Sequence, residues 1–166
     1  MESTSTIIGV IITLIILLPI IGIQRSQTSK KKKSKKRFID EAIKNNLNII
    51  EPDFWGTYYA IAIDESKNKL IYSKIINEVY NTKILDLNTI NSCEIIRTNR
   101  TFKNNKVFKT ETDKIDLVIS FTTNKDIEIL EFYNVDVNLE MTNEIALLEK
   151  WETKIKSKAH KNEQAA

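Results

Sequence analysis

The sequence predicts an α+β protein in which an N-terminal transmembrane helix precedes a bent antiparallel sheet of six to seven strands and a C-terminal helix. Three observations predict it. The first 24 residues carry almost no charge. The stretch from 57 to 135 divides into short β-rich runs separated by polar turns. Residues 141–158 return to the apolar spacing of a helix. A length of 166 residues suits one modest domain with an appendage.

The N-terminal segment, 1–24, is predicted to be an uncleaved membrane anchor. No charged residue occurs from Ser3 to Gln24, and residues 7–23 read IIGVIITLIILLPIIGI. A helix of about twenty apolar residues crosses the hydrocarbon core of a bilayer. A signal peptide is disfavoured, because no Lys or Arg precedes the run and no small-residue cleavage pattern follows it.

The segment 25–37 is predicted to be a polybasic linker. Its eight basic residues carry more positive charge than the chain's net charge of +3, so the rest of the chain is acidic. This uneven distribution disfavours a globally basic nucleic-acid binder. Positive charge marks the cytoplasmic flank of a membrane helix, which predicts a single-pass protein with its N-terminus outside and its C-terminal domain in the cytoplasm. The basic residues are Arg25, Lys30, Lys31, Lys32, Lys33, Lys35, Lys36 and Arg37.

These cations can also attract anionic lipid head groups. Topology alone is the simpler explanation of the run, and we treat lipid attraction as secondary. The membrane bilayer is therefore the first predicted partner, followed by anionic head groups and an unidentified protein, with no nucleic acid.

The predicted cytoplasmic domain, 38–158, begins with an amphipathic helix of about ten residues. Apolar residues recur at helical spacing in this segment. They are Phe38, Ile39, Ala42, Ile43 and Leu47. The helix is expected either to dock on the domain or to lie on the bilayer surface, and docking is the commoner arrangement.

Six β-rich runs follow, and they indicate an antiparallel meander. Because glycine is almost absent, Asn and Asp are expected at turns that need a positive φ. In the last run Leu130 breaks the alternation of Ile127 and Ile129, which indicates a bulge or a strand covered on both faces. The runs are 57–64, 68–76, 82–87, 91–98, 115–123 and 126–135.

The C-terminal helix is predicted from an apolar stripe that ends in a polar tail. The stripe indicates core packing, and residues 159–166 are expected to be disordered. Its members are Met141, Ile145, Leu148, Trp151 and Ile155. This order of elements is typical of a pleckstrin-homology-like arrangement, and another two-layer α+β sheet remains open.

Several stretches together resemble an uncharacterised family of bacterial single-pass membrane proteins with a small cytoplasmic domain. The resemblance covers about residues 38–156 and rests on order and spacing. It implies membrane location and assigns no catalytic residue. The stretches are EPDFWGTYYAIAID, NKLIY, DLNTINSCEIIRTNR, ILEFYN and LLEKWETKI.

The residue inventory leaves little room for catalysis. With one cysteine, one histidine and three glycines, a Cys/His zinc site and a Gly-rich phosphate loop are excluded. We therefore expect no enzyme and no cofactor, but a membrane-tethered binding or scaffold module. The alternatives are a carboxylate-based enzyme acting on a membrane-adjacent substrate and an accessory subunit of a larger membrane complex.

The stretch 95–113 is predicted to form a basic hairpin. The KNNK sequence favours a tight turn on Asn104-Asn105, which would pair Phe102 with Val107. Cations and the two phenylalanines of this hairpin suit contact with an anionic leaflet, although a solvated hairpin is the simpler interpretation. The cations are Arg97, Arg100, Lys103, Lys106 and Lys109.

Trp55, in the sequence DFW, is expected to be a buried plug at a strand start. The carboxylates Asp126, Glu128 and Glu131 are expected to be solvent-facing charges rather than a paired acid–base site.

Overall fold

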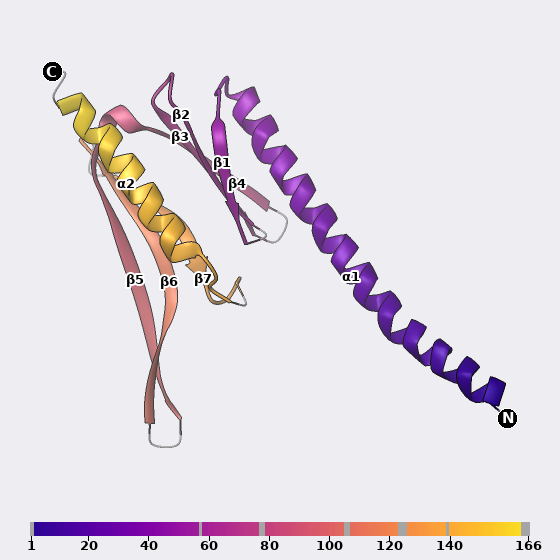
Figure 1. Ribbon diagram of the computed structural model, residues 1–166. Helices are drawn as coiled ribbons and strands as arrows, with labels where there is room; N and C mark the ends of the chain where they lie inside the picture. The colour runs from indigo at the N-terminus through magenta and orange to yellow at the C-terminus, as the bar shows by residue number, and fades with distance from the viewer. Residues whose placement is uncertain are drawn as a thin grey trace.

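The computed structural model describes residues 2–56, 58–76, 79–104, 107–122, 126–138 and 140–163. It is an α+β structure with two antiparallel sheets, a long N-terminal helix and a C-terminal helix (Figure 1). The elements are α1 (Glu2–Lys44), β1 (Ile50–Trp55), β2 (Tyr59–Asp64), β3 (Lys69–Ile76), β4 (Val79–Asp86), η1 (Leu87–Thr89), β5 (Ile90–Asn104), β6 (Val107–Phe121), β7 (Ile127–Asn134) and α2 (Glu144–Glu163).

Helix α1 runs without interruption through the segment that was predicted to be a linker. Lys, Arg and Gln are good helix formers, and residues 25–37 contain no glycine or proline. The helix ends where Asn46 takes a φ of 56°. There the Leu47 N–H donates to the Ala42 carbonyl and the Asn46 N–H to the Ile43 carbonyl, both at 2.8 Å. This pattern is a Schellman cap, which stops the helix beside the sheet.

Within the described part of the chain, no helix combines the length and the apolar character that a membrane crossing needs. Most side chains of the predicted anchor, 1–24, lie outside the described part; those of Thr13 and residues 15–19 are described, and all are exposed.

The strands form two meanders, in the orders β1-β2-β3-β4 and β5-β6-β7. The antiparallel meander is confirmed, but one bent sheet is replaced by two separate sheets. The break falls at η1, where the Asp86 carboxylate caps the Asn88 N–H at 2.9 Å. This short helix redirects the chain, so that β5 starts a new sheet instead of pairing with β4.

Strand β1 has no counterpart among the predicted strands, because Glu51 and Pro52 are not typical of a strand in the sequence. Proline cannot donate a ladder hydrogen bond, so it is confined to edge strands and bulges. Strand β1 is an edge strand, and its register with β2 shifts between Ile50 and Asp53. Within that bulge Glu51 takes a φ of 52°, which L-residues rarely adopt.

The first sheet is covered on both faces. Ile61 and Ile63 of β2 point into the main core, whereas Ala60 and Ala62 face α1, where Phe38 is buried against them. Docking of the first amphipathic segment is therefore confirmed for its Phe38, Ala42 and Leu47 face, while Ile39 and Ile43 remain exposed.

Helix α2 closes the main core with Leu148, Trp151 and Ile155, as its stripe predicted. It continues to Glu163, beyond the start of the predicted disordered tail. Ala159 packs against the core, and this contact stabilises the helix beyond Lys158. Residues 164–166 lie outside the described residues.

The break in the alternation of β7 at Leu130 is a bulge, which confirms the first of the two interpretations of this strand. Ile115 pairs with Tyr133 but Asp116 pairs with Glu131, so Phe132 is the extra residue. The bulge lets Leu130, Phe132 and Tyr133 all reach the core, whereas Ile127 and Ile129 are exposed.

Candidate functional site

The basic cluster lies on α1, between the apolar run and the docked end of the helix. Two of its cations contact the domain rather than pointing only to solvent. The Lys35 ammonium lies 4.9 Å from the Phe54 ring centroid, and the Arg37 guanidinium lies 3.6 Å from that of Tyr80. These cation–π contacts help fix the helix on the sheet. The cluster residues Lys30, Lys31, Lys32, Lys33, Lys35, Lys36 and Arg37 are all exposed.

The hairpin β5–β6 extends past the body of the domain as a two-stranded ribbon (Figure 1). Strand β7 pairs with β6 only from Lys114 to Ser120. The distal residues Asn99–Asn104 and Val107–Thr112 pair only with each other. We call these distal residues the β5–β6 arm.

The register of the arm differs from the predicted one. Phe102 pairs with Lys109, and Asn104 pairs with Val107, so the predicted Phe102–Val107 pair is wrong. The second residue of the predicted turn, Asn105, lies outside the described residues. The pairing shifts again between Thr98 and Asn99. The register of the arm is therefore offset by one residue from that of the strands at its base.

The arm carries exposed cations and aromatic rings. Arg100 pairs with Asp113 at 3.6 Å and Lys109 with Glu111 at 2.7 Å. Lys103 forms no ion pair with a described residue; its ammonium lies 5.8 Å from the Phe108 ring centroid. Lys106 lies outside the described residues. At the base of the hairpin, Arg97 reaches Glu149 of α2 at 4.0 Å.

A polar cluster joins the two sheets around Glu131. The Tyr59 hydroxyl donates to Glu131 Oε1 at 2.7 Å, and Asn134 Nδ2 donates to Oε2 at 3.2 Å. Lys74 forms an ion pair with the same carboxylate. The Tyr72 hydroxyl donates to the Glu131 carbonyl at 2.6 Å. Burial alone would raise the pKa of Glu131, but these donors lower it below its ordinary value.

Asp116 stands beside this cluster as the cross-strand partner of Glu131. Burial, followed by repulsion from Glu131, raises the pKa of the Asp116 carboxyl. The predicted solvent-facing role is thus wrong for Glu131, which is an internal ion-pair partner. Glu128 forms an ion pair with Lys83.

Trp55 is a buried plug, as predicted. Its indole stacks between Tyr59 and Phe132, with ring centroids 5.3 and 4.6 Å away, and its Nε1 donates to the Phe132 carbonyl at 2.8 Å. Asp53, from the same DFW sequence, accepts from Trp151 Nε1 at 2.8 Å and pairs with Lys150. This short segment therefore links β1 to both β7 and α2.

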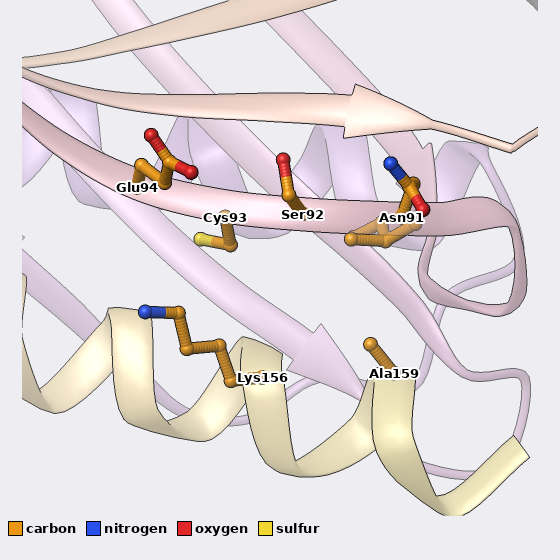
Figure 2. Close-up of a pocket in the computed structure, with 7 residues that line it drawn as sticks. Asn91, Ser92, Cys93, Glu94, Lys156 and Ala159 are labelled. Atoms are coloured by element: carbon orange, nitrogen blue, oxygen red, sulfur yellow. The ribbon is translucent and has the colours of Figure 1, made fainter. Parts of the chain in front are cut away.

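A cavity of about 220 Å³ opens between β5 and α2. Figure 2 shows the Cys93 side chain pointing towards α2, while Ser92 and Glu94 project to the opposite side of β5. Burial raises the pKa of the Cys93 thiol to about 12, with Glu152 adding to the effect. Lys156 is held by Glu152 at 2.8 Å. Neither group is prepared to act as a nucleophile at neutral pH.

No protein-family model, curated protein or solved structure matches this chain.

Sequence reasoning missed the cluster of Tyr59, Lys74 and Glu131. The three residues lie on β2, β3 and β7, far apart along the chain. The parity break at Leu130 was the one local signal, since a bulge can redirect the neighbouring acid. No local feature of the sequence indicates that Lys74 is the ion-pair partner of Glu131.

Proposed function

We propose that this chain is a membrane-anchored, non-enzymatic binding module whose small α+β domain is held at the cytoplasmic face. One observation carries the proposal. Helix α1 exposes large apolar side chains in its N-terminal half, with Ile15 64% and Leu18 62% exposed. Exposing such surface to water costs about 25 cal/mol per Å². A helix that is apolar on all of its faces is stabilised in a bilayer.

The sequence extends that observation over the whole run. From Ser3 to Gln24 the chain carries no charge, and eight cations follow at once. That asymmetry places the cation-bearing end in the cytoplasm. The domain follows the cations, so it lies on the same side.

The continuity of α1 gives the proposed anchor a mechanical role. The same helix that carries the apolar run buries Phe38 and Ala42 against the first sheet. A helix without a break between bilayer and domain fixes the distance and limits the tilt of the domain. Segment 25–37 then acts as a charged spacer of about 20 Å, from a rise of 1.5 Å per residue.

The domain is proposed to be pleckstrin-homology-like. Sheets of four and three antiparallel strands and a C-terminal helix that closes the core support this arrangement. A binding role is favoured over the carboxylate enzyme, because the neighbouring acids Asp116 and Glu131 are not a free pair. Glu131 is already engaged by Lys74 and Tyr59.

The proposal is tested by expressing the full chain in bacterial cells and washing the membranes with alkaline carbonate. We expect the chain to stay in the membrane pellet, and a reporter fused after Ala166 to be active only in the cytosol. Replacing Ile16 and Leu17 by lysine should release the chain. The matched control is Ile43→Lys, an exposed isoleucine of the same helix outside the apolar run. Release of the unmodified chain, or an external reporter, would overturn the proposal.

A further inference from the structure

We infer that the outer edge of β5, together with the cavity between β5 and α2, is a docking site for an extended segment of a partner protein. The segment adds a strand to the second sheet and places one apolar side chain in the cavity. This inference deepens the proposed function and rests on its binding role, but not on membrane anchorage.

Strand β5 has a regular and unused edge. Its register with β6 is continuous from Ser92 to Thr98, and β6 is its only strand neighbour. Among the described residues, no side chain donates a hydrogen bond to the main chain of this stretch. An edge strand presents a row of main-chain N–H and C=O groups on its outer side. The natural complement of such a row is another extended backbone.

Two of the other three edges are protected against pairing. Strand β1 carries Pro52 and a register shift, and both features discourage pairing at an edge. Three main-chain carbonyls of β7 accept hydrogen bonds from side chains of the first sheet. The donors and acceptors are Lys83 and Ile129, Tyr72 and Glu131, and Trp55 and Phe132. Strand β4 shares an open edge with β5, and the cavity beside β5 decides between these two strands.

The cavity lies against the main chain of the β5 edge. It is lined by five consecutive residues of β5, Ile90–Glu94, and by two residues of α2. In Figure 2 Cys93 points towards α2, whereas Ser92 and Glu94 project to the opposite side of the strand. Residues whose side chains project away line a cavity through their main-chain atoms. A strand that pairs with β5 therefore passes directly beside the cavity.

The size of the cavity suits one side chain. Sites for drug-sized molecules are about 300–1,000 Å³ in volume. This cavity is smaller, at about 220 Å³. Ile90, Cys93 and Ala159 contribute apolar surface to its lining, and all three pack in or against the main core. An apolar side chain of the docked segment is therefore its expected occupant.

The charges beside the cavity are already paired. Lys156 pairs with Glu152 at 2.8 Å, and Arg97 pairs with Glu149 at 4.0 Å. These four side chains sum to zero charge, whereas a nucleic acid or an anionic lipid surface is held by an excess of cations. An extended peptide needs no such excess, so a polypeptide is the favoured occupant.

The contact between Arg97 and Glu149 adds a preference for an acid in the partner. The pair is long and exposed, so its contribution to stability is small and a carboxylate of the partner can compete for Arg97. Cys93 and Arg97 lie on the same face of β5, because the register between them is regular and their positions differ by four. The expected segment thus carries an apolar residue and, four positions away, an acidic one.

The probe is a phage-displayed library of random peptides, selected on the full chain in detergent micelles. We expect the enriched peptides to share the apolar and acidic positions, and fluorescence anisotropy of synthetic copies measures their affinity. Ala159→Phe fills the cavity and should abolish binding. The matched control is Ser157→Phe, which places the same ring on an exposed position of α2. Fluorescence of the buried Trp151 during urea unfolding verifies that each variant is folded.

Charge reversal tests the acidic position. Arg97→Glu should weaken the peptides that carry the acid about tenfold, because it removes a hydrogen bond between charged groups. Arg100→Glu makes the same change farther along β5 and should leave their affinity unchanged.

Ester substitution in the peptide tests the mode of binding without altering the protein. Each ester replaces one amide and removes one N–H donor. Only every second residue of a paired strand directs its N–H towards the neighbour. Esters at alternate positions should therefore weaken binding about fivefold each, and esters at the positions between them should have little effect.

Three results would overturn the inference while the anchor, tested by carbonate extraction, stands. They are a selection that enriches no peptide, enriched peptides that bind folded Ala159→Phe as tightly as the natural chain, and ester effects that do not alternate. A dimer of the full chain that dissociates in Ala159→Phe during analytical ultracentrifugation would assign the edge to a second copy. That result would also overturn docking of a partner protein.

Discussion

The Tyr59 hydroxyl of β2 lies 2.7 Å from Glu131 Oε1 of β7 and donates a hydrogen bond to it. The same carboxylate holds Lys74 of β3. One acid from the second sheet therefore satisfies two donors from the first, and both partners of the ion pair are largely shielded, at 16% and 14% exposure. This contact is one of several polar links between the two sheets, which also share an apolar core.

Removing the Glu131 charge should weaken the domain. Glu131→Gln breaks the ion pair with Lys74 in a shielded site, so we expect a loss of about 2 kcal/mol in the free energy of unfolding. Tyr59→Phe should cost about 1 kcal/mol. Urea unfolding of the full chain in detergent micelles measures both, because Trp55 and Trp151 are buried and report by fluorescence.

Glu111→Gln is the control for this prediction. It removes an exposed ion pair with Lys109 in the arm and should cost about 0.5 kcal/mol or less. If Glu131→Gln costs no more than Glu111→Gln, the polar link does not stabilise the fold.

Removing the Asp116 charge should have the opposite effect. Burial and the neighbouring Glu131 raise the pKa of Asp116 above its ordinary value of 3.8. The folded state therefore prefers the protonated acid, and a penalty develops as the pH rises through that raised pKa. Asp116→Asn should stabilise the domain at neutral pH by about 0.5 kcal/mol and have less effect below pH 3.8. Asp113→Asn, which removes the ion pair with Arg100, should not stabilise it. A loss of stability in Asp116→Asn at neutral pH would contradict the assigned cause.

Asp64 should dominate the acid end of the stability profile. The Ser66 hydroxyl, together with the backbone N–H groups of Asn48, Lys67 and Ser66, lowers the pKa of this buried acid to about 2. Its contribution is present above the ordinary value of 3.8 and is lost as the pH falls through about 2. Unfolding midpoints recorded between these pH values should fall steeply in the natural chain.

In the Asp64→Asn variant, the same midpoints should depend less on pH. The variant should be less stable at neutral pH by about 2 kcal/mol, because an amide oxygen accepts the same hydrogen bonds more weakly. An unchanged slope would show that another acid governs the acid transition.

Gly56 occupies a position where a side chain is excluded by both conformation and space. Its φ is 53°, and a Cβ would lie 3.1 Å from Asn138 Nδ2. Asn138 in turn accepts from the Tyr59 hydroxyl at 3.2 Å. Gly56→Ala should therefore cost about 1–2 kcal/mol in urea unfolding. Glu51→Gly is the contrasting variant, since Glu51 has a φ of 52° and the change relieves strain. It should be neutral or stabilising, and a loss like that of Gly56→Ala would contradict the conformational argument.

The sequence by itself determined the class of the protein and most of its elements. Apolar spacing located α2 and the faces of Phe38 and Trp151, because a helix repeats its buried side every three to four residues. The general expectation that Asn takes positive φ where glycine is scarce holds at Asn46 and Asn68, whereas Glu51 also takes a positive φ that it did not cover. The single sheet was wrong, since a three-residue helix that carries little periodic signal separates β4 from β5.

Tertiary structure alone decided the register of the hairpin and the partners of Glu131. The register of β6 with its neighbours shifts at bulges formed by Asp113 in β6 and Phe132 in β7, and the Phe132 bulge is stabilised by the core that it fills. The ion pair between Lys74 and Glu131 joins strands that meet only when two sheets close over a common core. Local preference has a range of a few residues, so contacts between residues far apart in sequence become fixed only when the chain packs.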